Sequence, residues 1–97
     1  MHVEIPHNFT QVQAVERVKQ GLVAAKPQMQ GQVTIDKEEW EGNTLHFAFT
    51  AQKQKVTGTL EVVDKKFVVD AKLPLLWRMF EGRIEKAIQE QAAALTQ

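Results

Sequence analysis

The pattern of hydrophobic positions alternates between a period of two and a period near 3.6 along this 97-residue chain. Val3 and Ile5 alternate with polar residues, which predicts a short strand. Pro6 ends this strand or confines it to a sheet edge, because proline donates no ladder hydrogen bond. Apolar spacings of three and four then predict an amphipathic helix. Its predicted inner stripe contains Val12, Val15, Val18, Leu22 and Ala25.

Local signals predict where this helix begins and ends. Thr10 is the expected N-cap, and Gln13 completes a capping box in which each side chain hydrogen-bonds the backbone N–H of the other residue. The residue before a proline avoids the helical region, so Lys26 and Pro27 predict the end of the helix.

Alternation with period two returns in residues 32–73 and predicts four strands joined by three turns. The first turn is expected at residues 42–43, where Gly-Asn tolerates positive φ. The polar residues 52–55 predict a four-residue loop, and residues 64–65 a two-residue turn. Successive strands are therefore expected to pair antiparallel.

The predicted turns fix a strand register that can be checked. Across residues 64–65, Val62 is expected to pair with Phe67. Across the loop at 52–55, Phe47 is expected to pair with Leu60. Both pairings place large apolar side chains on one face of the sheet, as a one-sided core requires.

The first strand of this series departs from the alternation. Val33 and Ile35 occupy odd positions, whereas Trp40 occupies an even one. An extra residue in a strand shifts which face the later side chains occupy, so we expect a bulge near Lys37–Glu39.

The last element is predicted to be a helix that starts near Leu76, after the turn residue Pro74. The expected order is β-α-β-β-β-β-α. The fold class is α+β, with a single antiparallel sheet of four to five strands and two helices packed on one face. Residues 1–97 form a single domain. The stripe of the last helix is expected to contain Phe80, Ile84, Ala87, Ile88, Gln91 and Leu95.

Composition excludes several classes of function. Twelve basic and twelve acidic residues cancel, and a phosphate-neutralising protein usually carries a basic face, so nucleic acid is a poor partner. The chain has no cysteine, which removes disulfides and thiolate metal sites. No apolar run has the length of a transmembrane helix or a secretory signal. We therefore expect a soluble cytoplasmic protein.

The stretch "KLPLLWRMFEGRI" at residues 72–84 carries more large apolar side chains than one helix face can bury. Most of them suit the core. One or two are expected to reach the surface, where a contiguous apolar patch marks a contact site. The candidates for hydrophobic contact are Leu75, Leu76, Trp77 and Met79.

The polar face of the predicted sheet supplies a second set of candidates. Threonines suit a solvated strand surface, and a shallow ligand groove is the alternative. The candidates are His46, Thr57, Thr59 and Asp70. His46 with Asp70 or Glu61 is the nearest approach to a catalytic pair, but no nucleophile or oxyanion loop accompanies it. The histidines lack metal-ligand spacing, so we expect no metal. Without a nucleophile, an oxyanion loop or a Gly-rich phosphate loop, we expect no cofactor and no enzyme activity.

Four motifs in fixed order resemble those of the polyhydroxyalkanoic acid system family. They are "IPH" (5–7), "WEGNTLHF" (40–47), "VTGTLEV" (56–62) and "KLPLLWRMFEGRIEKAI" (72–88). The resemblance covers residues 4–95. Where the family pattern usually has glycine, this chain has Pro74. The family consists of small bacterial proteins whose genes lie beside those for polyester storage granules, and it brings no established catalytic residues.

The resemblance implies a role near intracellular polyester metabolism and leaves three functional hypotheses. The first is a non-catalytic accessory protein that contacts a granule surface or a granule-associated protein through residues 75–80. The second is a small carrier that holds an acyl or other apolar ligand between sheet and helices. The third is a minor enzyme that uses the His46 face. A homodimer is compatible with each of them.

Overall fold

The structure is a computed structural model that describes residues 1–95. Its order of strands and helices is the predicted one, with one short 3-10 helix added before the last helix. The elements are β1 (His2–Pro6), α1 (Gln11–Met29), β2 (Val33–Glu41), β3 (Thr44–Ala51), β4 (Gln54–Val62), β5 (Lys66–Lys72), η1 (Leu75–Phe80) and α2 (Glu81–Leu95).

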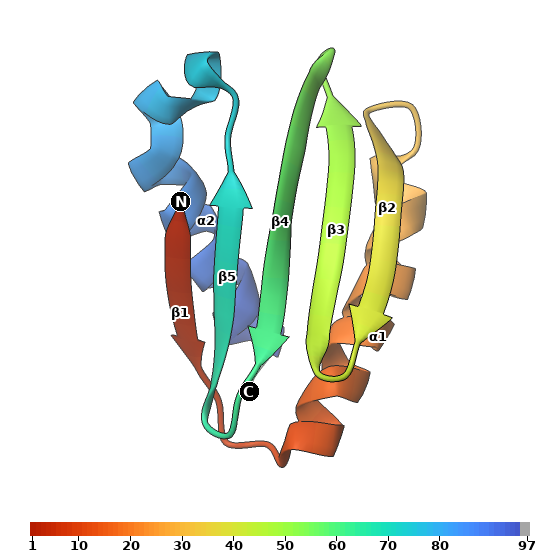
Figure 1. The fold of residues 1–97 in the computed structure, drawn as a ribbon, viewed down its shortest axis with the longest axis vertical. Coiled ribbons are helices and arrows are strands. Elements are labelled where there is room, and N and C mark those ends of the chain that lie inside the picture. The colour runs from red at the N-terminus through yellow and green to blue at the C-terminus, as the bar shows by residue number, and fades with distance from the viewer. Residues whose placement is uncertain (96–97) are drawn as a thin grey trace.

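The five strands form one antiparallel sheet in the order β1-β5-β4-β3-β2. Figure 1 shows both helices behind this sheet, with α1 on the side of β2 and β3 and α2 on the side of β1. The α+β class and the element order are confirmed. We call the covered side the helix face and the opposite side the outer face.

The hairpin between β4 and β5 has the predicted register, because Val62 pairs with Phe67. The hairpin between β3 and β4 does not: Phe47 pairs with Gly58, two residues from the predicted Leu60. The loop is shorter than expected, since Gln52 and Lys53 form a two-residue turn with positive φ at both positions. A shift of two residues keeps each side chain on its face, so the predicted apolar face persists.

The irregularity predicted in β2 is present, one residue before the predicted Lys37–Glu39. The pairing of β2 with β3 shifts between Ile35 and Lys37, which makes Asp36 the extra residue. Beyond the shift, Trp40 lies opposite Leu45 on the helix face. The bulge therefore places Val33 and Ile35, before it, on the same face of the sheet as Trp40, after it.

Helix α1 begins as predicted and ends later than predicted. The Thr10 hydroxyl accepts the Gln13 N–H, and the Gln13 side chain accepts the Thr10 N–H, which completes the capping box. The helix continues through Pro27 to Met29, so the predicted end at Lys26 is wrong. Pro27 leaves only the carbonyl of Val23 without a helical partner, and Val23 lies on the exposed side, where water can bond it.

The core lies between the sheet and the two helices. Its main cluster of buried residues is Val3, Ile5, Ala14, Val62, Phe67 and Val69, with partly buried neighbours that include Val15, Val18, Leu60, Ile88 and Ala92. Leu45, Val56 and Leu73 are buried as well. Ala14 rather than Val12 is the innermost residue of the first turn of α1. Val12 is 76% exposed, so its predicted place in the inner stripe is wrong.

The last helical segment is divided in two. Residues 75–80 form the 3-10 helix η1, and the α-helix starts only at Glu81, later than predicted. Pro74 precedes η1 with a φ of −56°, which the proline ring favours. Ile84 and Ile88 of the predicted stripe are half-buried, whereas Phe80, Ala87 and Gln91 are exposed. The side chain of Leu95 lies outside the part of the chain that the structure describes.

Candidate functional site

Large apolar side chains gather on the surface of η1, at the end of the sheet where β5 terminates (Figure 1). Leu75, Leu76 and Met79 are 78%, 66% and 84% exposed, and Phe80 is 48% exposed. We call these four residues the η1 patch. A cluster of this kind on a small protein with zero net charge is the feature expected of a contact surface.

The 3-10 geometry explains why these side chains cannot all turn inward. With three residues per turn, side chains three positions apart stack in rows, so Leu76 aligns with Met79 and Trp77 with Phe80. Trp77 is half-buried, and its backbone N–H donates to the carbonyl of Pro74 over 2.9 Å. Trp77 is the member of the predicted set that turns toward the fold, whereas Leu75, Leu76 and Met79 face solvent.

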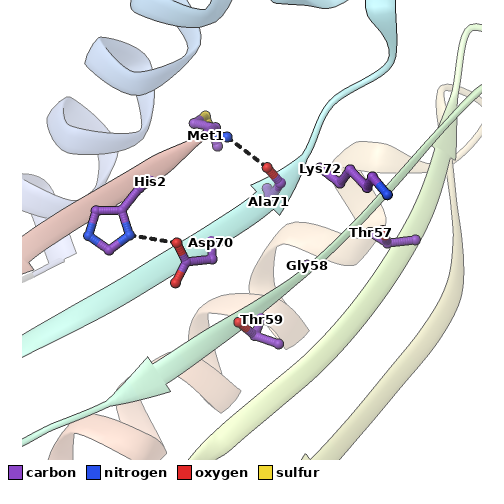
Figure 2. A pocket seen from close by; sticks show the side chains of 8 residues that line it. All are labelled: Met1, His2, Thr57, Gly58, Thr59, Asp70, Ala71 and Lys72. Atoms are coloured by element: carbon purple, nitrogen blue, oxygen red, sulfur yellow. Dashed lines mark hydrogen bonds and ion pairs between the residues drawn. The ribbon is translucent and has the colours of Figure 1, made fainter.

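The outer face of the sheet carries the second set of predicted residues, and β4 and β5 bring three of them together. Asp70 lies directly opposite Thr59, and Thr57 lies opposite Lys72. These residues line an open hollow of about 460 Å³ (Figure 2). Its full lining is Met1, His2, Thr57, Gly58, Thr59, Asp70, Ala71 and Lys72. The hollow forms because Thr57, Gly58 and Thr59 of β4 are shorter than the residues around them.

His2 occupies the rim of this hollow and lies between two carboxylates. Its Nδ1 is 2.5 Å from Oδ1 of Asp70 (Figure 2), and its Nε2 is 2.9 Å from Oε2 of Glu4. The hydrogen bonds with Glu4 and then Asp70 raise the pKa of His2 above its ordinary value. Lys66 donates to Glu4 over 2.6 Å and, with His2, lowers the pKa of Glu4 to about 2. The result is an exposed chain of alternating charges on the edge of the sheet.

His46 lies apart from the hollow, and its expected partners are wrong. Its Nε2 is 3.5 Å from Oε2 of Glu41, and the structure records no hydrogen bond or ion pair between His46 and either Asp70 or Glu61. Asp70 is on β5, two strands away from β3, and is bonded by His2. Sequence reasoning missed His2 because a histidine at the start of a short strand gives no sign of the strand that will pair with it.

His7 is a buried histidine that the sequence did not single out. It is 4% exposed, and its ring contacts Phe67 with a centroid separation of 4.6 Å. Nδ1 accepts the backbone N–H of Phe9, so Nε2 carries the proton and donates to the carbonyl of Val63. The backbone N–H of His7 also donates to Lys65. The "IPH" motif thus holds β1 and the start of α1 against the β4–β5 turn.

Residues 1–95 contain neither a cluster of metal ligands nor a membrane-spanning helix. Within residues 1–95, no three His, Cys, Asp or Glu side chains converge as metal ligands would. The two carboxylates near His2 use opposite nitrogens of its ring, which keeps them apart. In the same range, no helix has the length and apolar character needed to cross a bilayer.

A second hollow, of about 330 Å³, lies along the exposed side of α1, lined by Val12, Gln13, Glu16, Arg17 and Gln20. Neither it nor the outer-face hollow lies between the sheet and the helices, where a carrier would hold an apolar ligand. The carrier hypothesis gains no support from them and stays a prediction.

The fold and the motifs define a small α+β protein, and comparison with protein families gives the class to which it belongs. The chain belongs to the family described as "Putative polyhydroxyalkanoic acid system protein", whose model matches residues 1–95. This match confirms the resemblance found in the sequence. No curated protein and no solved structure matches the chain.

Proposed function

We propose that this protein is a non-catalytic accessory of a polyhydroxyalkanoate system that binds the granule surface through the η1 patch. Membership of a polyhydroxyalkanoic acid system family supports the choice of the polyester as partner, and the exposure of Leu75, Leu76 and Met79 carries the proposal of contact. The protein would act inside the cell, where the storage polymer accumulates.

Apolar burial is the driving force for adsorption through this patch. Full removal of a Leu or Met side chain from water is worth about 1.5–3 kcal/mol. Complete burial of three such side chains would supply about 4.5–9 kcal/mol, which is comparable with the roughly 4–15 kcal/mol that association costs in lost translational and rotational freedom. Leu76 and Met79 stack on one row of the 3-10 helix and would enter the apolar surface together. Arg78, on a neighbouring row, would stay at the water boundary.

The outer face supports a binding role rather than catalysis. The hollow beside Asp70 is open to solvent rather than enclosed. His46 and its partner Glu41 lie outside it on the flat sheet surface. A general base needs a concave site that holds a substrate within hydrogen-bond reach.

Sedimentation of the purified protein with protein-free polyhydroxyalkanoate particles tests the proposal. The variant Leu76→Ser/Met79→Ser should lose most of the binding, because two fully presented apolar contacts disappear. The matched control is Val12→Ser/Val23→Ser, which removes two side chains that are 76% and 68% exposed on α1. The control should sediment like the unsubstituted protein.

Two results would overturn the proposal. Equal loss in both double variants would mean that binding follows general surface hydrophobicity. Absence of binding by the unsubstituted protein, with binding restored when granule proteins are added, would make a granule-associated protein the partner. Circular dichroism of each variant verifies that the fold is intact.

A further inference from the structure

The charges on the outer face of the sheet are arranged in two halves around a central line. The line runs across the strands through register partners at helix-face positions: Ala71 on β5, Gly58 on β4, Phe47 on β3 and Glu38 on β2. Side chains immediately before and after these residues point to the outer face. Those outer-face neighbours differ in charge from one side of the line to the other.

Three strands repeat the same relationship. On β5, Lys72 and Asp70 flank the line by one residue each, and on β2, Lys37 and Glu39 do the same. On β4, Lys55 and Glu61 flank it by three residues each. In every pair the lysine lies toward the end of the sheet where β5 terminates, and the carboxylate lies toward the other end. Strand β3 carries no charged pair, and Ala48 and His46 flank its centre.

We propose that a second copy of this chain docks face to face on the outer face, related by a two-fold axis along this line. This axis lies in the interface plane and runs perpendicular to the strands. A half-turn about it places each strand opposite the same strand of the second copy, with the two strands running in opposite directions. Lys72 then faces Asp70 of the second copy, and Lys55 faces Glu61 of the second copy. One patch complements itself, as a closed homodimer requires.

The shape of the outer face fits this arrangement. Thr57 and Thr59 flank the line on β4, so short side chains meet at the centre while the long charged ones lie further out. The sheet faces the viewer in Figure 1, and the molecule measures 36 by 25 Å in that plane. Such a face can supply the roughly 800 Å² that each partner gives to a standard interface. The hollow lies across the line, so the hollows of the two copies would join.

Several of these charges are available to a partner. Within residues 1–95, the structure records no ion pair for Lys55, Lys72 or Glu61. Lys37 and Glu39 approach each other only to 3.8 Å. Asp36 is the one carboxylate in the lysine half, and it is 2.6 Å from the Thr50 hydroxyl at the bulge of the edge strand. Lys66, in the acidic half, is bound to Glu4.

Analytical ultracentrifugation of the whole chain at concentrations on the order of 100 μM tests the proposal. The dimer should dissociate at least tenfold more readily at about 1 M salt than at about 0.01 M, because the Debye length falls from about 30 to about 3 Å. Lys55→Glu alone and Glu61→Lys alone should each weaken dimerisation about tenfold or more, because like charges then face each other. The combined variant Lys55→Glu/Glu61→Lys reverses both charges, so opposite charges face each other again and dimerisation should be restored.

Lys86→Glu provides the control, because it makes the same charge change at an exposed position on α2. It should leave the dimer unchanged. The pair Lys72→Asp and Asp70→Lys repeats the test at the other contact in case one of the first variants folds poorly.

A monomer at low salt and high concentration would overturn the proposal, as would a combined variant that stays as weak as the single ones. Loss of the dimer in Leu76→Ser/Met79→Ser would also overturn it, by placing the interface on the η1 patch. The proposal is independent of polyester binding, since the sedimentation and ultracentrifugation experiments change different residues.

Discussion

Phe47 lies directly across from Gly58, and the Phe47 ring occupies the space that a side chain at residue 58 would need. A Cβ added to Gly58 would lie 2.8 Å from Cζ of Phe47 and 2.9 Å from Cα of Ala71, and still closer to the carbonyl oxygen of Asp70. The aromatic ring can turn away, but the backbone of β5 cannot move without disturbing the ladder. Gly58 therefore permits the close packing of β3, β4 and β5 at the centre of the sheet.

Gly58→Ala should destabilise the fold by about 1–3 kcal/mol, the range of overpacked sites. Gly82→Ala is the control, because a Cβ there meets nothing within 4 Å and the residue is helical. It should stabilise the protein by about 0.5–1 kcal/mol. Urea unfolding of both variants checks the pair. An unchanged midpoint for Gly58→Ala would show that β5 adapts at little cost.

His7 gives the second stability prediction. His7→Phe keeps an aromatic ring against Phe67 but leaves the N–H of Phe9 and the carbonyl of Val63 without their partner. Unsatisfied, largely buried backbone groups cost about 1–3 kcal/mol each, so we expect a loss in that range or above it. His46→Gln, at a half-exposed histidine, should change stability by less than about 0.5 kcal/mol. Equal effects in urea unfolding would contradict the assignment of His7 as a structural clamp.

The sheet could be predicted from the sequence because alternation specifies the face of each residue without specifying its exact partner. Val62 pairs with Phe67 as predicted, because a two-residue turn permits only one strand register. The β3–β4 turn was missed because Gln52 and Lys53 adopt positive φ without glycine or asparagine. The resulting shift of two residues changed partners but not faces. Val12 was misassigned because apolar spacing alone does not fix the rotation of a helix over a sheet.

The candidate sites were less predictable, for physical reasons. A run of large apolar residues does not reveal whether its backbone is α-helical or 3-10. In the 3-10 helix η1, Trp77 turns inward and Met79 is exposed. The partners of His2 and His46 depend on strand order, which places β1 beside β5 and leaves β4 between β5 and β3. Alternation within single strands contains no information about that order.

The capping box at the start of α1 provides a third stability prediction. Thr10→Ala removes the hydroxyl that accepts the Gln13 N–H over 3.2 Å. Loss of an N-cap side chain costs about 1 kcal/mol. Thr10→Ser retains the hydroxyl and should recover most of that loss. Thermal unfolding followed by circular dichroism measures both variants, and a Thr10→Ser variant as unstable as Thr10→Ala would assign the effect to the methyl group.

The exposed chain Lys66–Glu4–His2–Asp70 predicts a pH dependence with two signs. The pKa of His2 is raised from 6.5, so its contribution to stability is full below pH 6.5 and is lost as the pH rises through the folded value. The pKa of Glu4 falls from 4.5 to about 2, so its contribution is full above pH 4.5 and is lost as the pH falls through about 2. Both contributions to stability are therefore full between pH 4.5 and pH 6.5.

NMR titration of the His2 ring measures this coupling directly. Glu4→Gln should lower the pKa of His2 toward its ordinary value, because the hydrogen bond with Glu4 is the largest cause of the shift. Asp70→Asn should lower it as well, because the hydrogen bond and the charge of Asp70 both raise the pKa of His2. Lys86→Gln, on α2, should leave the titration unchanged. A His2 ring that titrates identically in the unsubstituted protein and in Glu4→Gln would show that the edge of β1 does not hold this chain of charges in solution.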